Sequence, residues 1–119
     1  MSYVDGFVVP VQKKKLQDYR RMAEKASKVW KEYGALEYVE SVADDVKPGK
    51  WTSFPQSVKL KAGETVVLAY VVYKSRAHRD SVMAKVMKDK RLTEMCNPKS
   101  MPFDGKRMFW GGFKPIVKA

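Results

Sequence analysis

Residues 65–74 read Thr-Val-Val-Leu-Ala-Tyr-Val-Val-Tyr-Lys, and this stretch decides the fold. Alternate positions of a β-strand point to opposite faces of a sheet, and here both sets of positions are apolar. A strand of this kind has to be covered on both sides. The chain therefore needs one layer of helices against one face of the sheet and a further apolar partner against the other.

The segments on either side of this strand have alternating strand and helix character. Residues 3–12 are rich in β-branched and aromatic side chains, and residues 35–46 alternate between apolar and polar side chains, which is typical of strands. Residues 13–33 carry apolar side chains at three- and four-residue steps as far as Gly34, which predicts an amphipathic helix and its end. Ser75 fits the N-cap of a second helix. The predicted elements are strands over 3–12, 35–46, 65–74 and 106–117 and helices over 13–33 and 75–92.

The order of these elements is β-α-β-β-α-β, which predicts an α+β fold of the ferredoxin-like type, with residues 1–119 as one domain. In this arrangement a four-stranded antiparallel sheet carries both helices on one face. The other face is bare in a monomer, although the strands carry Val, Tyr, Phe and Trp on both sides. A large exposed apolar face predicts a partner, and the simplest partner is a second copy of the same sheet. We therefore expect a homodimer that forms through the sheet face around a two-fold axis.

The residue inventory excludes several function classes. The chain has 119 residues, 45% of them hydrophobic, and its single cysteine (Cys96) and single histidine (His78) cannot form an intramolecular disulfide or a zinc finger. We expect neither a metal nor a cofactor. Residues 1–6 do not resemble a signal peptide, and no apolar run approaches the roughly 20 residues that span a bilayer, so a cytoplasmic protein without a membrane segment is expected. The common nucleotide, protease and hydrolase signatures are absent.

A carboxylate within an apolar strand is the first candidate site residue. Asp5 shares a strand with Tyr3, and with Tyr70 and Trp110 from neighbouring strands it is predicted to line a pocket inside the barrel, on the inner sheet face, for a small apolar or aromatic ligand. A buried carboxylate is expected to have a shifted pKa. The alternative is that Asp5 pairs with one of the many basic residues, of which Arg107 is one candidate.

His78 is a second candidate for the same pocket. A histidine there can act as a general base or as a haem ligand. The alternative is a histidine in the first helical turn that bonds a backbone group.

Cys96 has no nearby histidine or second cysteine in the sequence that would activate its thiol.

Two further pairs of residues are candidates for a functional site. Glu37 and Glu40 lie three residues apart on a predicted strand, so they point to opposite faces and are interpreted as solvated surface charges rather than an acid–base pair. Residues 47–63 contain two prolines and two glycines and read as a long loop. Long loops in small domains are often functional, and this one carries Trp51 and Phe54.

The net charge of +11 is concentrated on the predicted helices. Residues 13–33 and 74–91 each carry +5, whereas residues 35–46 carry −4. A basic helical layer can contact phosphates without reading a base sequence, so nucleic-acid binding is one hypothesis and an ordinary solvated surface is the other. The aromatic residues 109–113 are interpreted as core rather than as an RNA-stacking platform, because both faces of the strands look too apolar to stay open.

Five segments, taken in order, resemble the YbaA-like family of small bacterial proteins. They are Tyr-Val-Asp-Gly-Phe-Val-Val-Pro-Val (3–11), Gly-Glu-Thr-Val-Val (63–67), Ser-Arg-Ala-His-Arg-Asp (75–80), Met-Pro-Phe-Asp-Gly-Lys-Arg-Met (101–108) and Gly-Gly-Phe (111–113). The function of that family is unknown. Its fold is similar to that of the dimeric α/β-barrel proteins, which include cofactor-free monooxygenases, muconolactone isomerases and haem-binding dismutases. The resemblance therefore implies a dimeric α/β barrel.

Three functional hypotheses follow. The first is a homodimeric α/β barrel that binds a small apolar or aromatic ligand at the inner sheet face, with any catalysis suggested by analogy alone. The second is RNA or DNA binding through the basic helical layer. The third is a structural or interaction protein without a ligand site.

Overall fold

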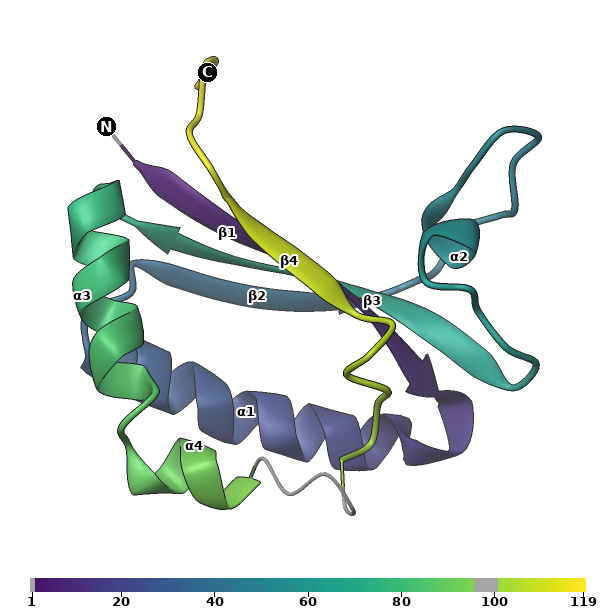
Figure 1. Cartoon of the computed structure of the whole chain (residues 1–119), viewed down its shortest axis with the longest axis horizontal. Helices are drawn as coiled ribbons and strands as arrows, with labels where there is room; N and C mark the ends of the chain where they lie inside the picture. Colours follow the sequence, from purple (N-terminus) through teal and green to yellow (C-terminus); the bar gives the residue numbers. More distant parts are fainter. Residues whose placement is uncertain (1, 96–100) are drawn as a thin grey trace.

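The doubly apolar segment forms the strand β3 (Glu64–Tyr73), which lies inside a four-stranded sheet (Figure 1). The computed structural model describes residues 2–95 and 101–119. The other strands are β1 (Tyr3–Gln12), β2 (Glu37–Val42) and β4 (Phe109–Phe113). The strand order is β2-β3-β1-β4, and every neighbouring pair is antiparallel. This is the strand order and pairing expected for the ferredoxin-like arrangement, which confirms the predicted fold class.

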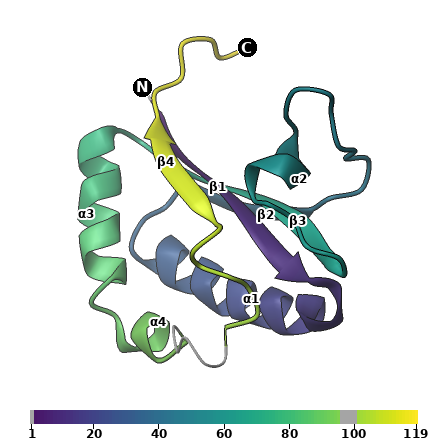
Figure 2. The ribbon, with the colours of Figure 1, turned by 45° about the vertical axis from the view of Figure 1, so that its right-hand side comes forward.

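The longer helices all lie on one face of the sheet, as the turned view in Figure 2 also shows. A short 3-10 turn, η1 (Lys13–Lys15), leads into α1 (Leu16–Glu32). The helix ends at Gly34, whose φ of +113° lies in the left-handed region where glycine is favoured. The same helical layer also contains α3 (Arg76–Val86) and α4 (Lys90–Met95).

The second predicted helix, over residues 75–92, is two helices with a break between them. Ser75 caps α3 as predicted, because its Oγ accepts from the backbone N–H of His78 at 3.1 Å. Asp89 begins the next helix: its Oδ1 accepts from the backbone N–H of Arg91 at 2.9 Å. A side-chain oxygen that satisfies a helical N–H in this way starts a new helix, which explains the break.

β2 and β4 are shorter than the sequence pattern predicts. β2 leaves its partner after Val42, and only the Ala43 N–H still bonds to β3, at the Val66 oxygen. Before β4 the chain turns at Asp104, whose backbone oxygen accepts from both Arg107 and Met108. Residues 106–108 therefore belong to a turn. Paired partners, rather than apolar pattern alone, set the ends of these strands.

The loop predicted over residues 47–63 contains a helical turn, α2 (Phe54–Ser57), that lies on the side of the sheet away from α1. Ser53 caps it by accepting from the backbone N–H of Gln56. Val58, which directly follows this helical turn, packs against Val8 and Val66 in a small buried cluster. This segment covers one end of the second sheet face.

The register assigns each side chain to a face. Val9, Val67 and Val71 pack against α1 and its neighbours and define the helix-facing side. Their neighbours along the strands form the second side, here called the open face. It carries the residues Val4, Leu68, Tyr70, Val72, Phe109 and Phe113. Leu68 is 46% exposed and Phe113 64%, so the open face is apolar and only partly covered in the single chain.

Candidate functional site

A hollow lies between α1 and the helix-facing side of the sheet. Its outer part is a groove of about 530 Å³ between α1 and β2, lined among others by Gln17, Arg20 and Ser27. Its inner part is a partly enclosed cavity of about 160 Å³ with mostly apolar walls. The cavity walls include the side chains of Phe7, Met22, Trp30, Val71, Leu92 and Phe103.

One carboxylate lies where the groove meets the cavity. Tyr19, Tyr38 and Glu40 line both hollows. The Tyr38 hydroxyl donates to Glu40 Oε2 at 2.6 Å, and the Tyr19 hydroxyl donates to Glu40 Oε1. Tyr38 and Glu40 are two residues apart on β2, so they share the face that looks towards Tyr19 in the first turn of α1. We call these three residues the Glu40 triad.

The electrostatics of the triad keep both phenols protonated. Burial raises the pKa of Tyr19 and of Tyr38, and the adjacent Glu40 carboxylate raises both further. Neither phenol is therefore suited to act as a base. A carboxylate has about four acceptor positions, and the two tyrosines use one on each oxygen. The remaining positions on Glu40 can accept hydrogen bonds from a ligand.

A second polar cluster surrounds Asp5, at the end of β1 nearest α3. Asp5 is 0% exposed, and its Oδ1 lies 3.8 Å from Nε of Arg79. Neither Asp5 oxygen has a hydrogen-bond partner among the described residues. Burial raises the pKa of Asp5, and the Arg79 charge opposes that shift. Arg79 also donates to the Tyr3 hydroxyl at 3.1 Å.

The partner of Asp5 is therefore Arg79, and the expectation of Arg107 is wrong. Arg107 makes a bidentate pair with Glu64, at 2.8 and 2.6 Å, and its Nε donates to Asp104 at 2.9 Å. These bonds hold the turn before β4 against the start of β3. Arg79 reaches Asp5 because α3 crosses the end of the sheet beside β1, a contact between residues 74 positions apart that no local pattern predicts.

Glycine at position 112 allows this cluster to pack. A Cβ atom built there lies 2.8 Å from Arg79 Nη2 and overlaps the Tyr3 ring and hydroxyl. Two glycines within a strand, as at residues 111–112, mark either a bulge or a close backbone approach. The pairing of β4 with β1 runs through Gly112 without interruption, so the reason is the close approach.

His78 lies at the edge of this cluster and bonds the backbone. Its Nδ1 accepts from the Lys74 N–H at 3.0 Å, and its ring meets the edge of Tyr73 with centroids 6.0 Å apart. This is the first-turn arrangement given above as the alternative to a ligand site. A role for His78 in binding stays a prediction.

The structure separates the five residues predicted to share a pocket. Tyr3 and Asp5 lie together on the helix-facing side with His78 nearby, and Trp110 is on the same side but stacks on Phe7, with centroids 5.8 Å apart. Tyr70 lies on the open face, because it pairs with Gly6 rather than with Asp5. The open face is the inner sheet face of the expected dimer, so Tyr70 lies on the face where the pocket is predicted. Tyr3, Asp5 and Trp110 lie on the other face, and a single pocket shared by all of them is therefore wrong. None of the five lines the groove or the cavity.

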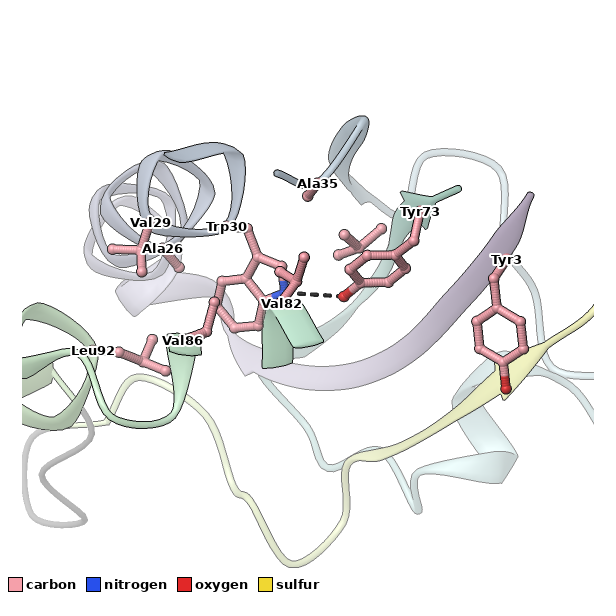
Figure 3. Close-up of a cluster of buried hydrophobic side chains, with 10 residues drawn as sticks. Tyr3, Ala26, Val29, Trp30, Ala35, Tyr73, Val82, Val86 and Leu92 are labelled. Carbon is pink, nitrogen blue, oxygen red and sulfur yellow. Dashed lines mark hydrogen bonds between the residues drawn. The ribbon is translucent and has the colours of Figure 1, made fainter. Parts of the chain in front are cut away.

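One hydrogen bond connects Tyr73, the partner of Tyr3 in the sheet, to the cavity wall. The Trp30 indole N–H donates to the Tyr73 hydroxyl at 3.1 Å within a buried group of side chains (Figure 3). Trp30 also forms part of the cavity wall, and its ring lies 5.7 Å from that of Tyr38. The walls of the cavity are thus held in place by buried packing.

Sequence reasoning missed the Glu40 triad. Glu37 and Glu40 do point to opposite faces, and Glu37 is exposed, but Glu40 is half-buried rather than solvated. The sequence feature that could have predicted the site is Tyr38-x-Glu40, two polar side chains on the same face of a strand.

Trp51 and Phe54, in the segment predicted as a long loop, are 86% and 45% exposed, and a binding role for them stays a prediction. Cys96 lies outside the described residues.

Two further features can be stated for the residues described, 2–95 and 101–119. They contain no group of three His, Cys, Asp or Glu side chains that could hold a metal ion. None of their helices is long and apolar enough to cross a membrane.

The chain is similar in sequence to one group of known proteins and similar in fold to several solved structures. Over 117 residues the chain is 49% identical to the "Uncharacterized protein YbaA" of Escherichia coli K12, with 98% of each chain covered. A NIPSNAP family protein from Agrobacterium tumefaciens shares the fold, with 16% identity, a TM-score of 0.63 and coverage of 97% of this chain and 93% of that one. A dimeric ferredoxin-like protein from an uncultured marine organism also shares it, with 12% identity, a TM-score of 0.56 and full coverage of both chains, 100% each.

The sequence profile described as "Protein of unknown function (DUF1428)" matches residues 2–105. This match and the YbaA identity confirm the resemblance drawn from the sequence motifs. The chain therefore belongs to the DUF1428 family, together with the YbaA proteins.

Proposed function

We propose that the protein is a homodimer that binds a small, mainly apolar ligand in the cavity between α1 and the sheet. The cavity itself carries this proposal, because about 160 Å³ of apolar space is close to the roughly 150 Å³ of an engineered cavity that holds benzene. The adjoining groove supplies a path from solvent. Apolar walls with a few converging polar groups are typical of small-molecule sites. The proposed position is on the helix-facing side of the sheet, not on the inner sheet face expected from the sequence.

Toluene is a suitable first probe of the cavity. We expect a toluene titration to shift the methyl signals of Met22 and Leu92 in NMR spectra while the signal of Leu68, on the open face, stays in place. Ala26→Leu fills the cavity from α1 and should remove the shifts. Ala77→Leu adds the same atoms at an exposed site on α3 and should leave them. Absence of any shift at saturating toluene, or shifts confined to Leu68, contradicts the proposal.

The open face supports the dimer. Leu68, Phe109 and Phe113 are each about half exposed there, and the centre of the face carries no charged side chain. An exposed apolar patch of this extent is typical of an interaction surface. The marine ferredoxin-like neighbour is described as dimeric, which favours a second copy of the chain as the partner.

Light scattering tests the dimer. We expect twice the chain mass of 13.7 kDa for the unmodified protein and one chain mass for Leu68→Asp. Met87→Asp places the same charge at a similarly exposed apolar residue in the helical layer and should remain dimeric. A monomeric unmodified protein contradicts this part of the proposal.

The helical layer gives less support to nucleic-acid binding. Several of its arginines, the side chains best suited to bidentate phosphate contacts, are engaged by carboxylates: Arg20 pairs with Glu24 at 3.2 Å, and Arg21 pairs with Asp18 at 2.7 Å. Arg91 pairs with Asp89 at 2.9 Å and also with Glu32. Salt-sensitive binding of RNA or DNA, together with no response to apolar probes, is the result that would favour this alternative.

A further inference from the structure

We infer that the ligand is a ring-sized apolar compound carrying a hydrogen-bond donor, such as an aromatic alcohol or amine, whose donor binds the Glu40 carboxylate. This inference rests on the proposed function and adds the chemical class of the ligand. It follows from the position of the Glu40 triad, from the direction of its hydrogen bonds, and from what surrounds it.

The position of the triad brings one end of a bound ring to Glu40. All three residues line the cavity and also the groove, so they form the boundary between the two hollows. A ring that fills the cavity among Met22, Trp30 and Leu92 has its outer edge at this boundary. A substituent on that edge therefore meets the carboxylate rather than an apolar wall.

The direction of the hydrogen bonds decides which substituent is accepted. Both phenolic protons of the triad are already donated to Glu40, one to each carboxylate oxygen. What remains available at the boundary are lone pairs on Glu40 and on the two phenolic oxygens. Hydroxyl and amino groups can satisfy these acceptors, whereas a carbonyl or carboxylate group cannot. A ligand carboxylate also meets the charge of Glu40 at close range.

The surroundings of the triad do not supply a competing donor inside the cavity. Arg20 is the one cation among the described groove-lining residues, but its Nε bonds Glu24 at 3.2 Å and its side chain is 70% exposed. The Ser27 hydroxyl donates to the Glu24 backbone oxygen at 2.7 Å. Burial and the Glu40 charge raise the pKa of both phenols, so their protons stay on the hydroxyls at neutral pH.

Four probes with the same ring test the inference: toluene, phenol, aniline and benzoate. Hydrogen bonds to a charged partner stabilise more than neutral ones, so we expect phenol to bind the unmodified protein about tenfold more tightly than toluene. Aniline also carries a hydrogen-bond donor and should, like phenol, bind more tightly than toluene. Benzoate should bind more weakly than toluene. Dissociation constants from NMR titration of the Met22 and Leu92 methyl signals measure the order.

Two matched variants assign the preference to Glu40. Glu40→Gln should reduce the ratio of phenol to toluene affinity to about threefold or less. Glu37→Gln makes the same substitution on the opposite face of β2 and should leave the tenfold ratio intact. The four-probe order on the unmodified protein tests the inference even if Glu40→Gln does not fold.

The outcomes separate the inference from the proposed function. Equal binding of toluene and phenol, or tightest binding of benzoate, overturns the inference while the cavity remains a binding site. Failure of all four probes to shift the cavity signals overturns the proposed function itself. A phenol preference that survives Glu40→Gln also overturns the assignment to Glu40.

Discussion

Replacing Arg79 by methionine tests the buried charge pair at the end of β1. Asp5 is 0% exposed, its oxygens have no hydrogen-bond partner among the described residues, and the Arg79 Nε atom 3.8 Å away is the cation beside it. Methionine keeps the length and apolar packing of the side chain and removes its charge. The substitution therefore leaves a buried carboxylate without a counter-ion.

The magnitude follows from the geometry. At 3.8 Å and an effective dielectric constant of about 20, the attraction between the two charges is about 4 kcal/mol. Breaking a buried pair by removing one partner costs about 3–5 kcal/mol in the free energy of unfolding, which is in the same range. We therefore expect Arg79→Met to lower the free energy of unfolding by about 3–5 kcal/mol at pH 7.

Urea unfolding at fixed protein concentration measures the effect, with two controls. Asp5→Asn combined with Arg79→Met removes the stranded charge, and we expect it to be at least about 1 kcal/mol more stable than Arg79→Met alone. Arg76→Met removes a neighbouring arginine on α3 whose side chain is 75% exposed, and its effect should stay within about 0.5 kcal/mol.

The pH dependence of Arg79→Met has a definite sign. Burial raises the pKa of Asp5 above its ordinary value of 3.8, so the folded state holds the proton more tightly than the unfolded state. Ionising Asp5 therefore costs stability as the pH rises from the ordinary pKa through the raised one, and losing Arg79 increases that cost. The stability difference between the two proteins should be largest at pH 7 and should shrink as the pH falls towards 4. A loss below about 1 kcal/mol at pH 7, or a difference that does not shrink in acid, refutes the reasoning.

Three other substitutions have defined outcomes. Gly112→Ala should lower the free energy of unfolding by about 1–3 kcal/mol in urea titrations, whereas Gly111→Ala, with ordinary contacts, should cost less. The hydrogen bonds from Arg107 lower the pKa of Glu64, which stabilises the fold above the ordinary pKa and is lost in acid. Glu64→Gln should therefore flatten the acid limb of a stability–pH curve. Ser75→Ala should cost about 1 kcal/mol by removing a helix cap, measured as a lower thermal midpoint.

Local patterns were sufficient for the fold because each element carries its own signal. The continuous apolar run over residues 66–73 and the three- and four-residue steps before Gly34 are properties of single segments, and both elements formed where they were predicted. The break at Asp89 depends on one side-chain hydrogen bond, and the end of β2 depends on where this strand separates from β3. Neither is visible in an apolar pattern.

The candidate site was harder to predict because it depends on contacts across the fold. Tyr19 and Glu40 are 21 residues apart, and neither is unusual in its own segment. Asp5 was recognised as a polar group in an apolar strand, but its partner lies on a helix 74 residues away. Strand spacing could have paired Tyr38 with Glu40, yet only the packing of α1 shows that this pair borders a cavity.

The position of a bound ring is the most direct test of the cavity site. A crystal of the protein soaked with 4-bromophenol locates the ring by the anomalous signal of bromine. We expect the bromine between α1 and the sheet, among Met22, Trp30 and Leu92, with the phenol hydroxyl on the Glu40 carboxylate. Bromine found only on the open face beside Leu68, or only elsewhere on the surface with the cavity empty, contradicts the account.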